Sequence, residues 1–324
     1  MSEKKPMVTI LLATCEGERY LPQLLESIRT QKYENWRLLV RDDNSQDSTM
    51  DILRMFAAKV PQNVKITVNK PASGSARNNF ALLFEDAAYE KADYVMCCDQ
   101  DDVWKPEKIF VTMQTMLWEE HVLMGSRVPI LVHTDLEVVD EQGDVIAPSM
   151  SEMSQIRRKQ TLEQLLLQNH VTGCTMMING PLLLGVADYI HGSAVIMHDY
   201  WCALYATVFG KVVAVKRATV EYRQHGKNSV GAKDSRRLSY LLGRLGQGKA
   251  DYKNQMHDSR KQVRWFLKCY GVRMKETRYE KEYELMREYG ELGRQSRAVR
   301  HTFYREHHAW KKGLARKIMQ YFWG

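Results

Sequence analysis

The chain has 324 residues, of which 44% are hydrophobic and 27% charged, so it is long enough for one large domain with an appendage and has the apolar content of a sizeable core. No apolar run approaches the roughly 20 residues that a membrane-spanning helix needs, and the first residues lack the pattern of a secretory leader. The six cysteines show no CxxC pair or other ligand spacing, which argues against a zinc site and predicts buried free thiols in a reducing cytoplasm.

The net charge of +8 is unevenly distributed along the chain. Residues 233–324 hold 23 Lys and Arg against 10 Asp and Glu, whereas residues 1–232 hold 24 against 29. A basic appendage on a mildly acidic globule predicts an anionic partner surface, either membrane lipid or nucleic acid. No base-reading motif accompanies the basic residues, which disfavours nucleic acid.

Apolar runs alternate with helical patterns over roughly the first 135 residues, which predicts parallel βαβ units. Strands are predicted at residues 7–14, 36–40, 64–68 and 94–98. Helices are predicted between them, with apolar faces drawn from residues 21–28, 52–56 and 80–87. Asp47 or Ser48 can cap the second of these helices, and Met55 is expected on its buried face.

The pattern is mixed after residue 130. A strand at 130–133 is followed by a hairpin-like segment at 137–146, whose turn contains Gly143. Further strands are predicted at residues 174–178, 212–215 and 218–222, and helices at 162–167 and 200–209. Beyond Arg236 only helical patterns remain, rich in Arg, Lys and Tyr.

The strand predicted at 94–98 ends in three carboxylates within four positions, those of Asp99, Asp101 and Asp102. Three crowded carboxylates repel one another and raise each other's pKa. A hard divalent cation such as Mg²⁺ or Mn²⁺ removes that conflict and commonly shares its coordination with substrate phosphates. The motif therefore predicts a metal-bridged nucleotide diphosphate. The alternative is an acidic turn that caps the next helix.

Polar residues also end the first two strands, and the ends of neighbouring parallel strands line one crevice, as in a nucleotide site. Thr14 and Glu16 follow the first strand, and Asp43 follows the second. Asp43 can accept a hydrogen bond from the imide N–H of uracil or thymine, although a turn-forming Asp is the alternative. Arg77 and Asn78 open a helix after a Gly/Ser loop, which suits a diphosphate or ordinary capping about equally.

Two later residues are candidates for catalysis and metal binding. Asp199 begins an aromatic helix, and its carboxylate could act as the general base that takes a proton from an acceptor hydroxyl. An acidic residue in a first helical turn is also ordinary, because the helix dipole favours it. His225 lies in a donor-rich loop and could complete the metal shell or contact phosphate, while a surface hydrogen-bonding role is the alternative.

These motifs follow one another in an order that resembles bacterial family-2 glycosyltransferases, most of all the rhamnosyltransferases that build cell-wall and capsular polysaccharides. The similarity spans roughly residues 7–232 and is carried by the runs VTILLATCEGERY, VRDDNSQDST, CCDQDDVWKPEKI, MHDYW and YRQHGKNSVG. It implies an α/β catalytic domain of the GT-A type with a mostly parallel central sheet. That domain would cover residues 1–232, with a nucleotide-binding half at 1–135 and an acceptor half at 136–232. Residues 233–324 would form a basic helical C-terminal region.

The resemblance also implies roles for single residues. Asp199 matches the catalytic base, and Asp43 resembles the residue that recognises the nucleobase. Mn²⁺ or Mg²⁺ would be held by Asp101, Asp99 and His225. The donor would be bound by Thr14, Glu16, Asp43, Arg77, Asn78, Asp99 and Asp102. The sequence departs from many relatives at Cys15-Glu16, where they have an aromatic residue and asparagine, and at His198, where they have glutamate. The first departure leaves the nucleobase-stacking contact open.

The reaction implied by the resemblance is an inverting single displacement by a metal-dependent glycosyltransferase. With dTDP-β-L-rhamnose as nucleotide-sugar donor, the product would be an α-L-rhamnoside on a saccharide acceptor, lipid-linked or part of a cell-wall polymer. A transferase for UDP-hexoses is the first alternative. A nucleotidyltransferase is disfavoured because Ala13–Tyr20 supplies only Gly17 to a triphosphate loop, and a non-catalytic scaffold of a polysaccharide assembly stays open.

The last segment has the pattern of a helix that lies in a membrane interface. Apolar residues recur there at i+4 spacing, with basic residues on the other faces: Trp310, Leu314, Ile318 and Phe322, with Lys311, Lys312 and Arg316. We therefore expect a cytoplasmic protein that is peripheral at the inner face of the cell membrane. The alternative is a helix that packs on its own domain or on the second subunit of a homodimer.

Overall fold

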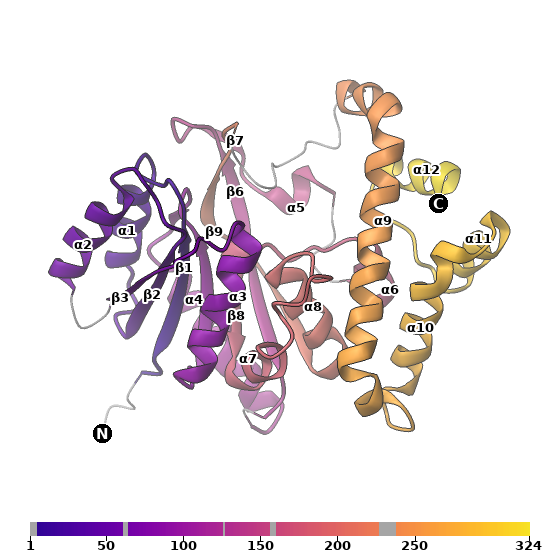
Figure 1. The fold of residues 1–324 in the computed structure, drawn as a ribbon, viewed down its shortest axis with the longest axis horizontal. Coiled ribbons are helices and arrows are strands. Elements are labelled where there is room, and N and C mark those ends of the chain that lie inside the picture. Colours follow the sequence, from indigo (N-terminus) through magenta and orange to yellow (C-terminus); the bar gives the residue numbers. More distant parts are fainter. Residues whose placement is uncertain (1–4, 61–63, 126, 156–159, 227–237) are drawn as a thin grey trace.

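The structure is a computed structural model that describes residues 5–60, 64–125, 127–155, 160–226 and 238–324 (Figure 1). Residues 1–4 and the predicted domain boundary at residues 232 and 233 lie outside these ranges, so the division into two parts stays a prediction. A nine-stranded sheet forms the centre of the molecule, and helices cover both of its faces. In spatial order the strands are β3 (Val64–Val68), β2 (Trp36–Asp42), β1 (Val8–Thr14), β4 (Tyr94–Asp99), β8 (Met176–Asn179), β6 (Ile130–Val139), β9 (Lys211–Arg223) and β5 (Val103–Trp104), with β7 (Val145–Ala147) paired to β6.

The sheet is mostly parallel, as the sequence predicts. Strands β3, β2, β1 and β4 pair in parallel, β8 runs against both β4 and β6, and β9 is parallel to β6. Six of these nine strands, β1 to β4 with β6 and β9, therefore point the same way. The segments predicted as two strands at 212–215 and 218–222 form the single strand β9, whose pairing with β6 shifts register twice. The irregular pairing explains why the apolar pattern is interrupted there.

Strands β1 and β4 are buried on both faces, which is why each has a continuous apolar sequence. Ile10 faces the core shared with α1 (Leu21–Arg29) and α4 (Lys108–Val122). Leu11, one position later, faces the core shared with α3 (Ala76–Tyr89). This alternation follows from the two-residue period of a strand. The carboxyl ends of β1 and β4 are thereby held rigidly between two packed layers.

The helix after β2 is α2 (Thr49–Lys59), and its capping and burial differ in part from the prediction. Asp47 Oδ1 accepts a hydrogen bond from the Thr49 N–H at 2.9 Å, whereas Ser48 makes no side-chain capping bond. Met55 is 64% exposed, so its expected burial was wrong. Helix α2 packs on α1 and β3, and only Leu53 and Phe56 of residues 52–56 are buried there. All six cysteines are free, and four of them, Cys97, Cys98, Cys174 and Cys202, are buried as predicted, whereas Cys15 is exposed and Cys269 is half-buried.

Shorter helices carry the chain from β7 to β9. These are α5 (Met150–Met153), α6 (Leu162–Leu167), the 3₁₀ turn η2 (Gly173–Thr175), α7 (Gly180–Val186) and α8 (His198–Phe209). Helix α8 is buried over almost its full length, because the sheet lies on one side of it and the C-terminal helices on the other (Figure 1). The first turn of α8 is therefore fixed from several directions.

The C-terminal region is helical, as expected. It consists of α9 (Leu238–Met274), α10 (Glu280–Glu291), the short turn η3 (Leu292–Arg294), α11 (Arg297–Glu306) and α12 (Leu314–Trp323). The rings of Phe266 on α9 and Trp201 on α8 pack edge to face at 5.3 Å, and Tyr289 on α10 donates a hydrogen bond to the Leu166 carbonyl at 2.9 Å. These helices thus share a core with α6 and α8. Within the described ranges, no helix combines the length and apolar content needed to cross a bilayer.

Candidate active site

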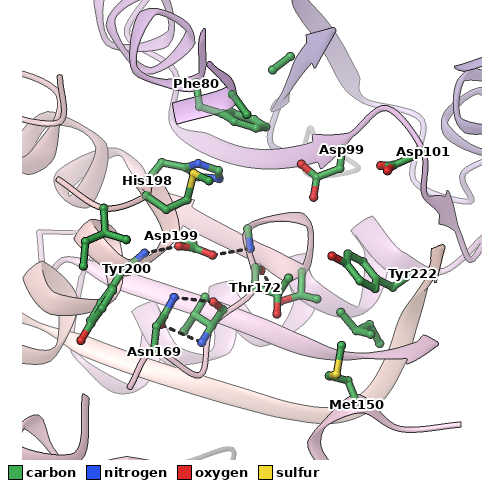
Figure 2. Close-up of a pocket in the computed structure, with 18 of the residues that line it drawn as sticks. Phe80, Asp99, Asp101, Met150, Asn169, Thr172, His198, Asp199, Tyr200 and Tyr222 are labelled. Atoms are coloured by element: carbon green, nitrogen blue, oxygen red, sulfur yellow. Dashed lines mark hydrogen bonds between the residues drawn. The ribbon is translucent and has the colours of Figure 1, made fainter. Parts of the chain in front are cut away.

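One cavity of about 1450 Å³ opens at the carboxyl ends of β1, β2 and β4. It continues past the first turn of α8 and the segment 167–173, and it ends against α9 and α12. Figure 2 shows Asp99 and Asp101 on one side of this cavity, with Asp199 and His198 across from them. The predicted catalytic and metal-binding carboxylates therefore face one space, although they are 100 positions apart in the sequence.

The carboxyl ends of β1, β2 and β4, where the sequence predicted polar site residues, lie side by side. Strand β1 lies between β2 and β4, with Thr14 opposite Asp42 and Ala13 opposite Asp99. Thr14 Oγ1 donates a hydrogen bond to Asp42 Oδ1 at 2.8 Å, and Thr14 lines the cavity. The expectation that these ends form one crevice is confirmed.

Asp43 lines the cavity and also organises the loop after β3. Its Oδ1 accepts hydrogen bonds from Asn69 Nδ2 at 2.9 Å and from the Ser73 N–H at 2.5 Å, and its Oδ2 accepts one from the Gly74 N–H at 3.0 Å. Burial opposes ionisation of this carboxyl, but the hydrogen bonds outweigh it and hold the pKa of Asp43 below its ordinary value. Asp43 is therefore an anion that fixes the loop after β3 at this end of the cavity.

The loop after β1 is clamped by Gln100, a residue that sequence reasoning did not single out. Gln100 Oε1 accepts a hydrogen bond from the Cys15 N–H, and Gln100 Nε2 donates one to the Cys15 carbonyl, both at 2.9 Å. A Cβ on Gly17 would lie 2.5 Å from Gln100 Oε1, so glycine is required for this close approach. Glu16 lines the cavity with a φ of 49°, and its Oε1 accepts a hydrogen bond from the Gln46 N–H at 2.8 Å.

Asp99 and Asp101 present their carboxylates to the cavity. Burial, together with the nearby Asp101 and Asp199, raises the pKa of Asp99 to about 7. His225 Nε2 lies 2.7 Å from Asp101 Oδ2, and the imidazole stacks on Tyr20 at 5.1 Å. Carboxylate and imidazole groups are ligand types that suit Mg²⁺ or Mn²⁺. Among the described residues, however, the three ligand atoms that lie within 4.8 Å of one another are those of Asp99, Asp102 and Cys174, so the metal set Asp99, Asp101 and His225 stays a prediction.

The side chain of Asp102 was predicted to bind the donor, but it does not line the cavity. It is fully buried beneath the cavity wall, and its Oδ1 accepts a hydrogen bond from the Arg223 N–H at 3.3 Å. Burial and the neighbouring Asp99 raise its pKa well above the ordinary range. One atom each of Asp99, Asp102 and Cys174 lie within 4.8 Å of one another, but burial also raises the pKa of Cys174, and a protonated thiol is a poor ligand for a hard cation. Asp102 is therefore buried outside the cavity lining, and its support of the donor stays a prediction.

Arg77 and Asn78 are not among the residues that line the cavity, and their contact with the donor stays a prediction. Arg77 Nη1 donates a hydrogen bond to the Val195 carbonyl at 3.2 Å, and Asn78 Nδ2 donates one to the Ser73 carbonyl at 2.7 Å. Asn79 lines the cavity instead, buried and bonded to Asn69 and to the Arg41 carbonyl. A polar residue on the buried face beside Phe80 was the signal that could have identified it.

Asp199 stands in the first turn of α8. Its Oδ2 accepts a hydrogen bond from the Gly173 N–H at 3.1 Å, and its Oδ1 accepts one from the Tyr200 N–H at 2.5 Å. Burial raises the pKa of Asp199 to about 7 despite these bonds. The neighbouring His198 is buried with its ring 4.0 Å from that of Phe80, and burial lowers the pKa of His198 to about 3. Asp199 is thus an oriented carboxylate that can exchange a proton near neutral pH.

Comparison with known proteins identifies the family to which this chain is similar. A family model described as glycosyl transferase family 2 matches residues 9–182. The chain is 26% identical to the dTDP-rhamnosyl transferase RfbG of Shigella flexneri over 241 residues, 72% of this chain and 78% of that protein. Three further bacterial glycosyltransferases are matched over 41–50% of their own length.

Two solved structures share the fold. S. aureus TarS 1-349 in complex with UDP-GlcNAc matches 97% of this chain and 89% of its own at 15% identity, with a TM-score of 0.54. The mannosyltransferase PcManGT from Pyrobaculum calidifontis, in complex with GDP-Man and Mn²⁺, matches 98% of this chain and 84% of its own at 13% identity, with a TM-score of 0.51. At these identities the similarity establishes the architecture.

Proposed function

The chain belongs to glycosyl transferase family 2, and from that premise we propose that it is a metal-dependent, inverting glycosyltransferase that moves a sugar from a nucleotide donor to a saccharide hydroxyl. The observation that carries this proposal is the position of Asp199, whose carboxylate faces the same cavity as Asp99 and Asp101. A base on one side of a reacting centre and a diphosphate-binding group on the other are what a single displacement requires.

Asp99, Asp101 and His225 would hold Mn²⁺ or Mg²⁺, which supplies positive charge to the departing nucleoside diphosphate. His225 also positions Asp101 through their 2.7 Å contact, while Tyr20 holds the imidazole from the other side. A manganese complex of the structurally similar PcManGT supports the choice of metal. Asp102 supports this group from below, by anchoring the Arg223 backbone.

Asp199 takes the proton of the attacking acceptor hydroxyl. Its pKa of about 7 makes the carboxylate a stronger base than an ordinary Asp while leaving a large fraction ionised at neutral pH. The two backbone N–H groups that bind it fix the orientation of both oxygens, and each oxygen keeps a second lone pair that can accept another hydrogen bond. Transfer of a β-linked donor sugar with inversion then gives an α-glycoside.

We assign the nucleoside to the end of the cavity lined by Thr14, Glu16 and Asp43. The donor we favour is dTDP-β-L-rhamnose, on the strength of the 26% identity to a dTDP-rhamnosyl transferase. A donor screen tests this choice: thermal stabilisation and release of nucleoside diphosphate are measured with dTDP- and UDP-sugars, with and without Mn²⁺. Preference for UDP-hexoses overturns the rhamnose assignment and keeps the reaction class. Pyrophosphate release from a sugar phosphate and a nucleoside triphosphate indicates a nucleotidyltransferase instead.

We further propose that α12 lies on an anionic membrane surface, where a lipid-linked acceptor would be found. Its outward face carries Ile318, Tyr321 and Phe322, which are 47%, 54% and 62% exposed. Its inward face carries Arg316 and Gln320, which are buried. An ordinary amphipathic helix would bury its apolar side chains and expose its polar ones, whereas α12 does so only in part: Trp323 packs against the core and Lys317 is exposed, but the residues named here do the opposite.

Only part of the apolar stripe predicted for residues 310–322 faces solvent: Ile318 and Phe322 are exposed. Trp310 packs against the core, and Lys311 and Arg316, expected on exposed faces, are buried. The side chain of Leu314 lies outside the described part of the structure. The charge supports an anionic surface, because residues 292–324 contain eight Lys and Arg against one Glu. A second copy of the chain on the same face would make a homodimer, and vesicle binding compared with the oligomeric state in solution distinguishes the two.

A further inference from the structure

The cavity is larger than a donor site alone. Small-molecule pockets usually occupy about 300–1,000 Å³, whereas this cavity measures about 1450 Å³. The donor residues occupy the end at β1, β2 and β4, and Asp199 stands in the middle. The remaining space lies between the segment after α6 and the C-terminal helices, lined by Gln168, His170, Asp251, Gln255, Lys311 and Arg316. The helical extension is thus a wall of the same cavity.

The wall on the α6 side contains buried polar atoms for which the described part of the chain supplies no hydrogen-bond partner. Both ring nitrogens of His170 and the Oε1 of Gln168 are inaccessible to bulk solvent and make no hydrogen bond to any described residue. Buried polar atoms are nearly always bonded, so these call for a ligand or an ordered water. The His170 ring packs edge-on against His133 at 5.1 Å, and burial with His133 beside it lowers the pKa of His170 to about 3. The imidazole is therefore neutral and offers one donor and one acceptor.

The opposite wall is built by α9 and the segment that leads into α12. Gln255 Oε1 accepts a hydrogen bond from Lys311 Nζ at 2.6 Å, and the ammonium group lies 5.0 Å from the centre of the Tyr252 ring. Arg316 Nη1 donates a hydrogen bond to the Ser154 carbonyl at 2.8 Å. Asp251, one turn before Gln255, lines the same wall with its side chain exposed to the cavity. These contacts fix a polar surface that is assembled from segments more than 150 positions apart.

We infer that this far end of the cavity is the acceptor subsite and that it binds a hydroxyl-rich saccharide between the segment 168–170 and helix α9. The inference rests on the proposed function, because it needs a donor at the other end and Asp199 between the two. A sugar hydroxyl both donates and accepts hydrogen bonds, and this surface offers an amide, a neutral imidazole and a carboxylate that match it on both sides. The C-terminal region is then a specificity-determining part of the active site.

The test uses the full chain with Mn²⁺ and the preferred donor, and octyl glycosides of glucose, galactose, N-acetylglucosamine and rhamnose as acceptor probes. The variants are Asp251→Ala and Gln255→Ala on α9, and His170→Phe on the other wall. Asp258→Ala and Asn254→Ala are matched controls, because both residues are exposed on α9 and do not line the cavity. We expect the acceptor KM to rise about tenfold or more in each test variant, the typical effect of one lost hydrogen bond to a charged or buried group. The controls should be unchanged.

The donor KM and the slow hydrolysis of donor by water should stay within about twofold of wild type in the α9 variants, since those residues lie away from the donor. Unchanged acceptor KM in all three test variants overturns the acceptor subsite. If no glycoside is a substrate, saturation-transfer NMR from the same glycosides replaces KM: transfer seen with wild type and lost in the variants supports the subsite, and no transfer to wild type overturns it. Failure of the proposed function is distinct, because donor binding and hydrolysis would then be absent in wild type.

Discussion

The backbone N–H of Gly173 donates a hydrogen bond to Asp199 Oδ2 at 3.1 Å, and no side chain fits on that glycine. A Cβ there would lie 2.5 Å from His198 Nε2, closer than the 3.0 Å below which real Cβ atoms essentially never approach another atom. His198 is held in turn by Phe80, so it cannot retreat easily. The 3₁₀ turn η2 and the first turn of α8 therefore set the position of Asp199 together.

Gly173→Ala should displace the His198 ring and, through it, the adjacent Asp199. We expect kcat to fall by up to about 10²-fold, the scale of an ångström-sized misplacement of a catalytic group, with donor KM nearly unchanged. Steady-state kinetics with the preferred donor measure this. The double variant Gly173→Ala with His198→Ala makes room for the new methyl group and should recover a large part of kcat. Full activity of the single variant would show that Gly173 does not control Asp199.

Asp199→Asn removes the base while keeping one oxygen, which can accept one of the two backbone hydrogen bonds. Turnover should fall by about 10²–10⁴-fold, because general-base assistance is lost. Thermal stabilisation by donor and Mn²⁺ should remain. Asp188→Asn, an exposed carboxylate after α7, is the matched control and should behave as wild type. Undiminished polysaccharide synthesis in cells that carry Asp199→Asn would instead support the scaffold alternative.

The pKa of Asp199 gives a pH dependence with a defined sign. The base must be ionised, so kcat at saturating Mn²⁺ and donor should rise as pH increases through about 7 and then level off. Folding stability moves the other way. The folded pKa of about 7 exceeds the ordinary 3.8, so the stabilisation is complete below pH 3.8 and is lost as pH rises through about 7. Chemical denaturation of wild type and Asp199→Asn at several pH values measures this. If the free energy of unfolding changes equally with pH in both proteins, the raised pKa of Asp199 is contradicted.

Substitution of the proposed metal-binding residues should weaken the affinity of the protein for Mn²⁺. His225→Ala and Asp101→Asn should each weaken Mn²⁺ binding by roughly 10–100-fold, because a ligand or its positioning partner is removed. A Mn²⁺ titration of thermal stability and activity after treatment with a chelator measures the change. His257→Ala, an exposed imidazole on α9, is the matched control. Mn²⁺ midpoints that stay the same in both variants would place the cation elsewhere.

Much of the donor end of the cavity follows from local sequence. Apolar runs that end in polar residues predicted β1, β2 and β4, and the β1 register confirms that Thr14 and Asp99 end neighbouring strands. The directions of single side chains were less predictable. Arg77 turns to the Val195 carbonyl and Asp102 lies beneath the wall, because helix rotation and the turn after β4 depend on distant packing.

The far end of the cavity was missed for a related reason. His170 and Asp251 line the same end of the cavity only because α9 packs on α6 and α8. No local sequence pattern predicts that packing. Residues of α9 looked like an ordinary charged helix in the sequence. Similarly, the burial of Arg316 depends on a hydrogen bond to the Ser154 carbonyl, 162 positions away. Long-range contacts of this kind are set by the tertiary structure alone.

The outward face of α12 gives the last prediction. The double variant Ile318→Ser with Phe322→Ser removes two exposed apolar side chains and leaves the buried Arg316 and Gln320 in place. Co-sedimentation with phosphatidylglycerol vesicles should weaken by about 10-fold or more, since each apolar side chain contributes about 1.5–3 kcal/mol when fully buried. Leu184→Ser with Val272→Ser, exposed at 63% and 92% on other helices, is the matched control and should bind as wild type. Equal binding by both variants, or a dimer in solution that only the α12 variant dissociates, would show that this face does not bind lipid.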